Sequence, residues 1–427
     1  MNIISSINDI LAFFQPLFNS QGYELFCSFI LGILCYPKRK TISGIYQCRS
    51  ADQPKNRACP SKFRYWSMVK FLSRGKWDAD LLAQRLLCLI QKHYENWVYI
   101  YDETHTIKTG KAQFGLHFFR NYRYQKRNTN QSKFHWGHQF AALGLLCWTA
   151  SQAILFPIWV KMIIPGDAIY NSLEVLKTIA TNIPLGLIIM DRGFNKRKVF
   201  KVLLEQGHHI LCRAKSNAVF YYPRVIDPLI KRRGRKGKYG QRVSVPDLQF
   251  CDVHALGQTV SVASAIVWTK MCSQKVRLVV RRTRDDETKP YKYFMVYTTD
   301  MSLSIETILR YYRLRWELET AFRDTKENFG FDNYQVRSHK SINRFVQLSF
   351  VATSIMQLMC SLSDSIKNLS VDEVLETLGI YWYKPSKITR GLMQAYVQYL
   401  TLKHLFSASK VMSNYTQKKQ RTLMKAA

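Results

Sequence analysis

Hydrophobic residues recur with two different periods along the chain, and the change of period divides it into regions. Up to residue 95, apolar residues return every three or four positions, as in "SINDILAFFQPLF", "YELFCSFILGILCY" and "DADLLAQRLLCLIQKHY". This spacing predicts amphipathic helices. From about residue 96, short apolar runs such as "WVYIYDET" and "LGLIIMDRGF" predict buried strands instead. After about residue 340 the helical period returns.

Strands and helices are expected to alternate over residues 96–214. The runs "HQFAALGLLCW" and "AILFPIWVKMII" predict the second and third strands. The order that follows, with two helices and two more strands, predicts an α/β fold in which helices flank a mixed sheet. Residues 215–290 interrupt this order with "VSVASAIVWTK" and "KVRLVVRRT", which predict a β-rich basic insertion. The strand "YKYFMVYTTD" then leads into a helix capped by Ser304.

The charge balance narrows the range of partners. The chain has 63 Lys and Arg against 29 Asp and Glu, which gives a net charge of +34. Such an excess favours a polyanion, with nucleic acid first and an anionic membrane surface second. Basic loops between the N-terminal helices suit a DNA-binding region, although a helical packing domain with solvated loops explains them as well. The ten cysteines are dispersed without metal-site spacing, and no signal peptide is expected from the first residues.

One stretch without charge is long enough to cross a membrane. Residues 141–160 carry no charged side chain. However, Thr149, Ser151 and Gln152 lie in its middle and Pro157 lies near its end. Two buried strands joined by a polar turn explain this pattern better, so we expect no membrane partner.

Four polar residues share one stripe of the helix that we predict over residues 311–330. They are Tyr312, Arg315, Glu319 and Lys326. Separations of three, four and seven place them within an arc of about 60° on a helix. An ordinary ion pair between Arg315 and Glu319 on a solvated face explains this stripe if it is considered alone.

Two aspartates change the interpretation of this stripe. Asp102 and Asp191 each end an apolar run, and strand ends line the crevice in which open sheets bind ligands. Each alone is explained by strand termination or helix capping. Together with Glu319 they form a set of carboxylates suited to Mg²⁺ or Mn²⁺, and two such ions catalyse phosphoryl transfer. Arg315 would then hold a non-reacting phosphate.

These residues resemble a known family. The spacing of the four-residue stripe is similar to the Tyr-Arg-Glu-Lys signature of bacterial transposases of the insertion-sequence-four superfamily, "IIMDRGF" resembles their second-aspartate motif, and "YDETHTIK" resembles the first. The resemblance covers residues 96–340. It implies a ribonuclease-H-like core with an insertion before the glutamate helix. It also implies cut-and-paste DNA transposition, in which Asp102, Asp191 and Glu319 are catalytic and hold two Mg²⁺ or Mn²⁺ ions.

The resemblance also implies which residues contact DNA. The partners would be the terminal inverted repeats and the target DNA, bound by a homodimer in a synaptic complex, in the bacterial cytoplasm at the nucleoid. Trp268 is the candidate for stacking on a flipped base, ahead of Tyr297 and Phe294, although a core aromatic residue is the simpler explanation. We expect a DNA-tracking loop, or a solvated basic loop, over residues 231–242. The predicted DNA contacts are Tyr312, Arg315, Lys326, Arg192, Trp268, Lys231, Arg232, Arg233, Arg235 and Lys236.

The predicted organisation has five regions. A helical, DNA-binding region covers residues 1–95, the catalytic core covers 96–214 and 291–340, the insertion covers 215–290, and a C-terminal helical region covers 341–427. Two alternatives to a transposase stay open. One is a ribonuclease-H-fold DNA nuclease without strand transfer, and the other is a non-catalytic DNA-binding repressor derived from a transposase.

Overall fold

The computed structural model describes residues 3–50, 64–121, 132–149, 152–225, 237–362 and 369–407. The chain divides into two compact units. The first consists of Met1–Asn96, Glu103–Ile164 and Thr320–Ala427, and the second of Trp97–Asp102 and Pro165–Glu319. Strand β1 (Trp97–Ile107) and helix α9 (Trp316–Asn328) therefore each contribute residues to both units.

The first unit contains most of the helices, as the apolar periodicity predicts for the N-terminal region. Side-chain caps start several of them: the carboxylate of Asp78, for example, accepts hydrogen bonds from the first N–H groups of α5. These elements are α1 (Ile3–Ala12), η1 (Gln15–Leu17), α2 (Ser20–Cys35), α3 (Ile42–Ser50), α4 (Tyr65–Ser73), α5 (Ala79–Gln91), α10 (His339–Ser361), α12 (Val371–Leu378) and α13 (Arg390–Ser407).

Three antiparallel strands complete the first unit. β3 (Phe134–Trp148) pairs along its length with β4 (Ala153–Ile163), and its beginning pairs with β2 (His117–Arg120). The uncharged stretch 141–160 therefore forms two strands, as predicted. No helix among the described residues is long and apolar enough to cross a membrane. β2 was not predicted, because its two aromatic residues stand between His117 and Arg120 and do not form an apolar run.

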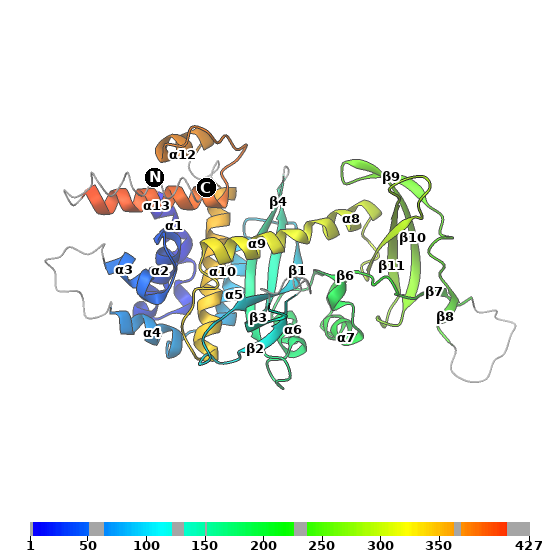
Figure 1. Ribbon diagram of the computed structural model, residues 1–427, viewed down its shortest axis with the longest axis horizontal. Helices are drawn as coiled ribbons and strands as arrows, with labels where there is room; N and C mark the ends of the chain where they lie inside the picture. Colours follow the sequence, from blue (N-terminus) through cyan, green and yellow to red (C-terminus); the bar gives the residue numbers. More distant parts are fainter. Residues whose placement is uncertain are drawn as a thin grey trace. The chain divides into compact units, whose positions relative to one another are not determined.

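Helix α10 binds β4 through side-chain amides as well as apolar contacts, and the two lie side by side (Figure 1). The Asn343 amide oxygen accepts a hydrogen bond from the N–H of Met162 at 2.8 Å. Gln347 accepts one from the N–H of Val160 at 3.1 Å and donates one to the carbonyl of Ile158 at 2.7 Å. These buried amides satisfy backbone groups of β4 that face away from β3.

Arg344 on the same helix binds the backbone at the end of α4 and just after it. Its side chain is 2% exposed. The guanidinium donates to the carbonyls of Leu72 at 3.0 Å and Gly75 at 2.9 Å, and also to those of Phe71 and Trp77. It lies 4.4 Å from the centre of the Trp77 ring. Several backbone oxygens thus compensate this buried cation, together with the nearby charge of Asp78.

We therefore expect Arg344→Ala to destabilise the protein strongly. The change leaves buried carbonyls without a donor, and a loss of about 3 kcal/mol in the free energy of unfolding is expected. Urea denaturation followed by circular dichroism measures it. Lys340→Ala, at an exposed position on the same helix, is the matched control and should change the stability by less than about 0.5 kcal/mol. Equal stabilities of the two variants would contradict this role for Arg344.

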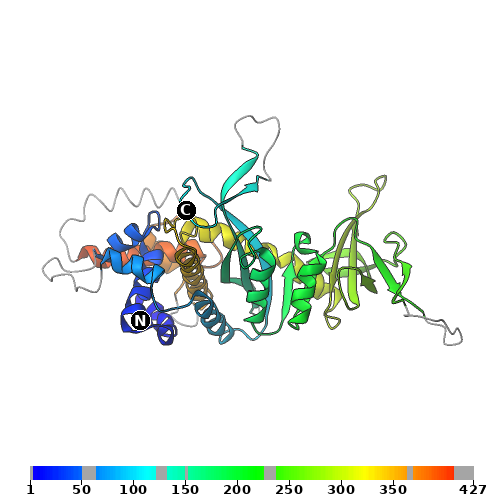
Figure 2. The same ribbon diagram turned by 90° about the horizontal axis from the view of Figure 1, so that it is seen from below.

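The second unit is built on a mixed sheet. β1 pairs in parallel with β5 (Leu187–Met190), and β5 pairs in parallel with β6 (His209–Arg213). Helices α6 (Ser172–Thr181) and α7 (Arg197–Glu205) precede β5 and β6 and pack side by side (Figure 2). The sheet continues from β6 through antiparallel strands in the order β12, β11, β10, β7 and β8, while β9 pairs with β10. This is the predicted ribonuclease-H-like mixed α/β sheet.

The β-rich insertion extends this sheet. Its strands are β7 (Phe220–Pro223), β8 (Tyr239–Arg242), β9 (Cys251–Ala255), β10 (Gln258–Thr269) and β11 (Val276–Thr283), and β12 (Lys292–Thr298) follows them. The helical elements η2 (Arg192–Phe194) and α8 (Ile305–Leu314) flank the site. The turn between β9 and β10 has positive φ at both central residues, Leu256 and Gly257, as a tight two-residue hairpin requires. Helix α8 begins after Ser304, the predicted cap, whose hydroxyl accepts a hydrogen bond from the N–H of Thr307.

Candidate active site

Asp102 and Asp191 occupy neighbouring positions on two parallel strands. The pairing of β1 with β5 runs as far as Tyr101 opposite Met190, so Asp102 and Asp191 are the next residues in the same register. Asp191 directly follows β5, as predicted. Asp102 does not end its strand, so that prediction was wrong: β1 continues to Ile107 because it pairs with β3 beyond the end of β5.

The glutamate helix differs from the single helix predicted over residues 311–330. Helices α8 and α9 meet at Arg315. There the N–H of Arg315 bonds to the carbonyl of Tyr312, and the N–H of Leu318 bonds to the carbonyl of Arg315. Both bonds join residues three apart, so one turn of 3₁₀ type interrupts the α-helical pattern. Such turns within helices often mark strain or a hinge.

Arg315 joins two of the three predicted catalytic acids. Its Nη1 donates to Asp102 Oδ2 at 3.1 Å, and its Nη2 donates to Glu319 Oε1 at 2.8 Å. The exposed fractions of the three side chains are 12% for Arg315, 18% for Asp102 and 33% for Glu319. The hydroxyl of Tyr312 donates to Asp191 Oδ1 at 3.0 Å. The ion pair within the helix is therefore present, but it is one part of a group that includes all three acids.

The protonation of this group follows from its surroundings. Burial lowers the pKa of Arg315, but the attraction of Asp102 and the hydrogen bond to Glu319 oppose this, and the net effect raises it above its usual value. Burial raises the pKa of the Tyr312 phenol, and the charge of Asp191 raises it further. Arg315 is therefore a permanent cation, and Tyr312 stays a neutral hydrogen-bond donor.

The acids have the right chemistry for a divalent cation but not the right arrangement. Carboxylate oxygens are the ligands that Mg²⁺ and Mn²⁺ prefer. Over the part of the chain that is described, however, no three His, Cys, Asp or Glu side chains are placed so that they would hold a metal ion. Asp102 and Glu319 instead share the guanidinium of Arg315. In this arrangement the three carboxylates do not fit a metal ion.

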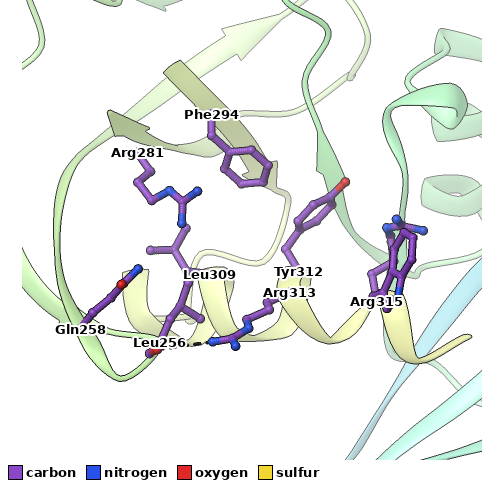
Figure 3. Close-up of a pocket in the computed structure, with 9 residues that line it drawn as sticks. Leu256, Gln258, Arg281, Phe294, Leu309, Tyr312, Arg313 and Arg315 are labelled. Carbon is purple, nitrogen blue, oxygen red and sulfur yellow. Dashed lines mark hydrogen bonds between the residues drawn. The ribbon is translucent and has the colours of Figure 1, made fainter. Parts of the chain in front are cut away.

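A cavity of about 460 Å³ adjoins Tyr312 and Arg315 (Figure 3). The ring of Phe294 lies 5.5 Å from that of Tyr312, and the guanidinium of Arg281 lies 5.5 Å from the centre of the Phe294 ring. Further lining residues are Arg313, whose guanidinium donates to the carbonyl of Leu256, and Trp316. Rings and guanidinium groups thus share one hollow, which suits an anion that carries an aromatic group.

Three of these cavity residues were missed by the sequence analysis. They are Arg281, Arg313 and Trp316. The sequence does contain a signal for Trp316, because a large apolar ring directly after Arg315 borders the polar stripe, and this ring is 62% exposed in the structure. Arg281 has no comparable signal, since only the pairing of β11 with β12 brings it opposite Phe294.

Arg192 contributes to a second hollow, of about 450 Å³, in the same unit. It follows Asp191 directly and is exposed. Lys215, Ser216 and Asn217, from the segment after β6, line the same hollow. Two cations beside a hydroxyl and an amide make a positively charged recess suited to a phosphate group. Lys215 and its neighbours were not singled out in the sequence.

Lys326 is in the first unit, whereas Tyr312, Arg315 and Glu319 are in the second. Its Nζ donates to the carbonyl of His105 at 2.7 Å, and burial lowers its pKa. A lysine bonded in this way joins α9 to β1. Its predicted contact with DNA stays a prediction.

The remaining predicted DNA contacts lie in the insertion. Trp268 on β10 is partly exposed, and its ring lies 4.5 Å from the Nζ of Lys238. Tyr297 is 1% exposed and its hydroxyl donates to Asn195, so this ring is closed to a flipped base. Lys231, Arg232, Arg233, Arg235 and Lys236 lie outside the described residues.

Acids on adjacent strands of a ribonuclease-H-like sheet and on a following helix suggest an enzyme that processes nucleic acid. A family model described as a transposase DDE domain matches residues 156–355. This range contains Asp191 and Glu319, begins after Asp102 and covers slightly less than half of the chain. The match supports a DDE transposase, a class of endonuclease or transferase that acts on DNA and generally uses divalent metals. A search of curated proteins found no match.

Removing the phenol that binds Asp191 should weaken the second unit. Tyr312→Phe removes a hydrogen bond to a carboxylate, and we expect the free energy of unfolding to fall by about 1.5 kcal/mol. Urea denaturation measures the change. The control is Tyr222→Phe, because Tyr222 is 38% exposed in the same unit. If the two variants lost equal stability, the contact between Tyr312 and Asp191 would be unimportant for folding.

Proposed function

We propose that this chain is a DDE transposase of the insertion-sequence-four superfamily, which cuts DNA at the ends of a mobile element and joins the freed ends to target DNA. The observation that carries the proposal is the grouping of Asp102, Asp191 and Glu319. Three segments far apart in the sequence bring these acids into one group through Arg315 and the register of β1 with β5. The match to the transposase DDE domain supports the same conclusion.

Each acid has a defined role in this proposal. Asp102, Asp191 and Glu319 would hold two Mg²⁺ or Mn²⁺ ions only once Arg315 no longer binds Asp102 and Glu319. Such ions would supply the activation of a water or a 3′-hydroxyl and the stabilisation of the leaving oxygen. Asp102 lies within β1 and Asp191 directly follows β5, whereas Glu319 lies on α9 after the irregular turn at Arg315.

The basic residues bind and position the DNA. Arg192 and Lys215 offer two cations to one phosphate next to Asp191, and Tyr312 and Arg315 contact the reacting strand. Lys326, Trp268 and the basic run 231–236 extend the contact along the duplex, and the helical region 1–95 adds a further DNA-binding surface. The inverted repeats and the target are held by a homodimer in the synaptic complex, in the cytoplasm at the nucleoid.

Loss of any one acid should abolish chemistry but not DNA binding. Asp102→Ala, Asp191→Ala and Glu319→Ala are each expected to lower cleavage and strand transfer by at least about 1,000-fold, because the acids act as a unit. The assay uses a plasmid that carries the gene with its flanking DNA, together with a separate target plasmid. Mobility shifts measure DNA binding in parallel.

Glu317→Ala is the matched control, since Glu317 is an exposed acid on the same helix. It should leave both activities unchanged. Full activity in any of the three acid variants would remove that residue from the catalytic group. Hydrolysis without joined products would favour a ribonuclease-H-fold nuclease, and DNA binding without either product would favour a repressor.

Arg192 should contribute one phosphate contact. Arg192→Ala is expected to weaken DNA binding and to reduce the slope of log Kobs against log salt concentration by about 0.9. Fluorescence anisotropy of a labelled duplex at several salt concentrations provides the slope. Lys201→Ala is the control, because Lys201 is exposed on α7 and already pairs with Glu205. An unchanged slope for the Arg192 variant would show that the recess does not bind phosphate.

A further inference from the structure

The strongest unexplained feature of the site is that a cation already occupies it. Asp102 and Glu319 are bound to the two terminal nitrogens of one guanidinium. An arginine fork that reaches two carboxylates forms charge-assisted hydrogen bonds with fixed geometry. The three side chains are partly buried, so water screens this attraction less than on an open surface.

We propose that Arg315 is a resident counter-ion that competes with divalent cations for Asp102 and Glu319. This inference rests on the proposed function and concerns how the same site is regulated. Without a metal, Arg315 neutralises part of the repulsion between the carboxylates and keeps them close together. A divalent cation gains both carboxylates only after the guanidinium has released them.

Arg315 also lines the cavity that contains Arg281, Arg313 and Phe294. A phosphodiester anion bound in this cavity would attract the guanidinium of Arg315 away from the two acids. The backbone bonds between residues three apart at Arg315 are the place where the helix can adjust.

This exchange couples the two ligands of the enzyme. A DNA phosphate that attracts Arg315 raises the affinity of the acids for the metal, and by linkage the metal raises the affinity for that phosphate by the same factor. Metal would therefore bind weakly to the free protein and tightly once DNA is in place. Such coupling restricts the metal-loaded state to the DNA complex.

Binding of Mn²⁺ alone to the full-length protein tests this competition. Electron paramagnetic resonance measures free Mn²⁺ in titrations of the wild type, Arg315→Gln, Arg310→Gln and Asp102→Asn. Arg315→Gln removes the competing charge, and its affinity for Mn²⁺ should rise at least about tenfold, within the usual range of coupling between sites. Arg310→Gln removes a nearby exposed charge on α8, whose guanidinium lies over the Tyr311 ring and does not line the cavity, so its affinity should stay close to that of the wild type.

The outcomes separate this inference from the proposed function. Equal Mn²⁺ affinities in the wild type and in Arg315→Gln, both reduced by Asp102→Asn, would overturn the competition while leaving the metal site intact. An equal gain in Arg310→Gln would also overturn it, because general electrostatics would then explain the effect. If Asp102→Asn left the Mn²⁺ affinity of the wild-type protein unchanged, the metal site and the proposed function would both fail. Circular dichroism checks that each variant is folded.

Arg315→Lys provides a second measure. Lysine keeps the charge but lacks the planar fork that reaches two carboxylates together. The Mn²⁺ affinity of this variant should lie between those of the wild type and Arg315→Gln. An affinity below that of the wild type would contradict the role of the forked contact.

Discussion

The parallel pairing of β1 with β5 is the constraint on which the acid group depends. Once Tyr101 lies opposite Met190, the next residues of the two strands must lie side by side, and both are aspartates. A shift of one residue in this register would turn the Asp102 side chain to the other face of the sheet. The buried apolar strands hold the register, because each has its hydrophobic side chains in the core. Packing of the sheet therefore sets the spacing of the acids.

Acidic residues are scarce in this chain, and Arg315 binds two of them. In a chain with 63 basic and 29 acidic residues, a carboxylate is rarely far from a cation. The described structure uses one arginine for two acids and a neutral phenol for the third. This arrangement holds a concentrated negative charge inside a protein whose overall field attracts DNA. The acids are stabilised from within the site, and the large positive surplus stays available to the polyanion.

The periodicity of apolar residues predicted the individual helices and strands. The contacts between these elements could be identified only in the folded structure. The helices of the N-terminal region and the strands β1, β3, β4, β5 and β6 were predictable because each has a clear period or an apolar run. The turn at Arg315 was not, since its sequence has neither Gly nor Pro to mark an interruption. The pairing of Arg315 with Asp102 crosses 213 positions, and no local pattern encodes it. Arg281 and Lys215 were missed for the same reason.

The amides of Asn343 and Gln347 give the first unit a property that its apolar packing alone would not provide. They bind the outer backbone groups of Val160 and Met162, which an open edge strand would offer to any extended chain. An edge closed in this way cannot accept a strand from a second molecule or from a misfolded neighbour. A protein with a large sheet benefits from such protection against aggregation. Any second molecule that binds this unit therefore cannot do so by extension of the sheet at β4.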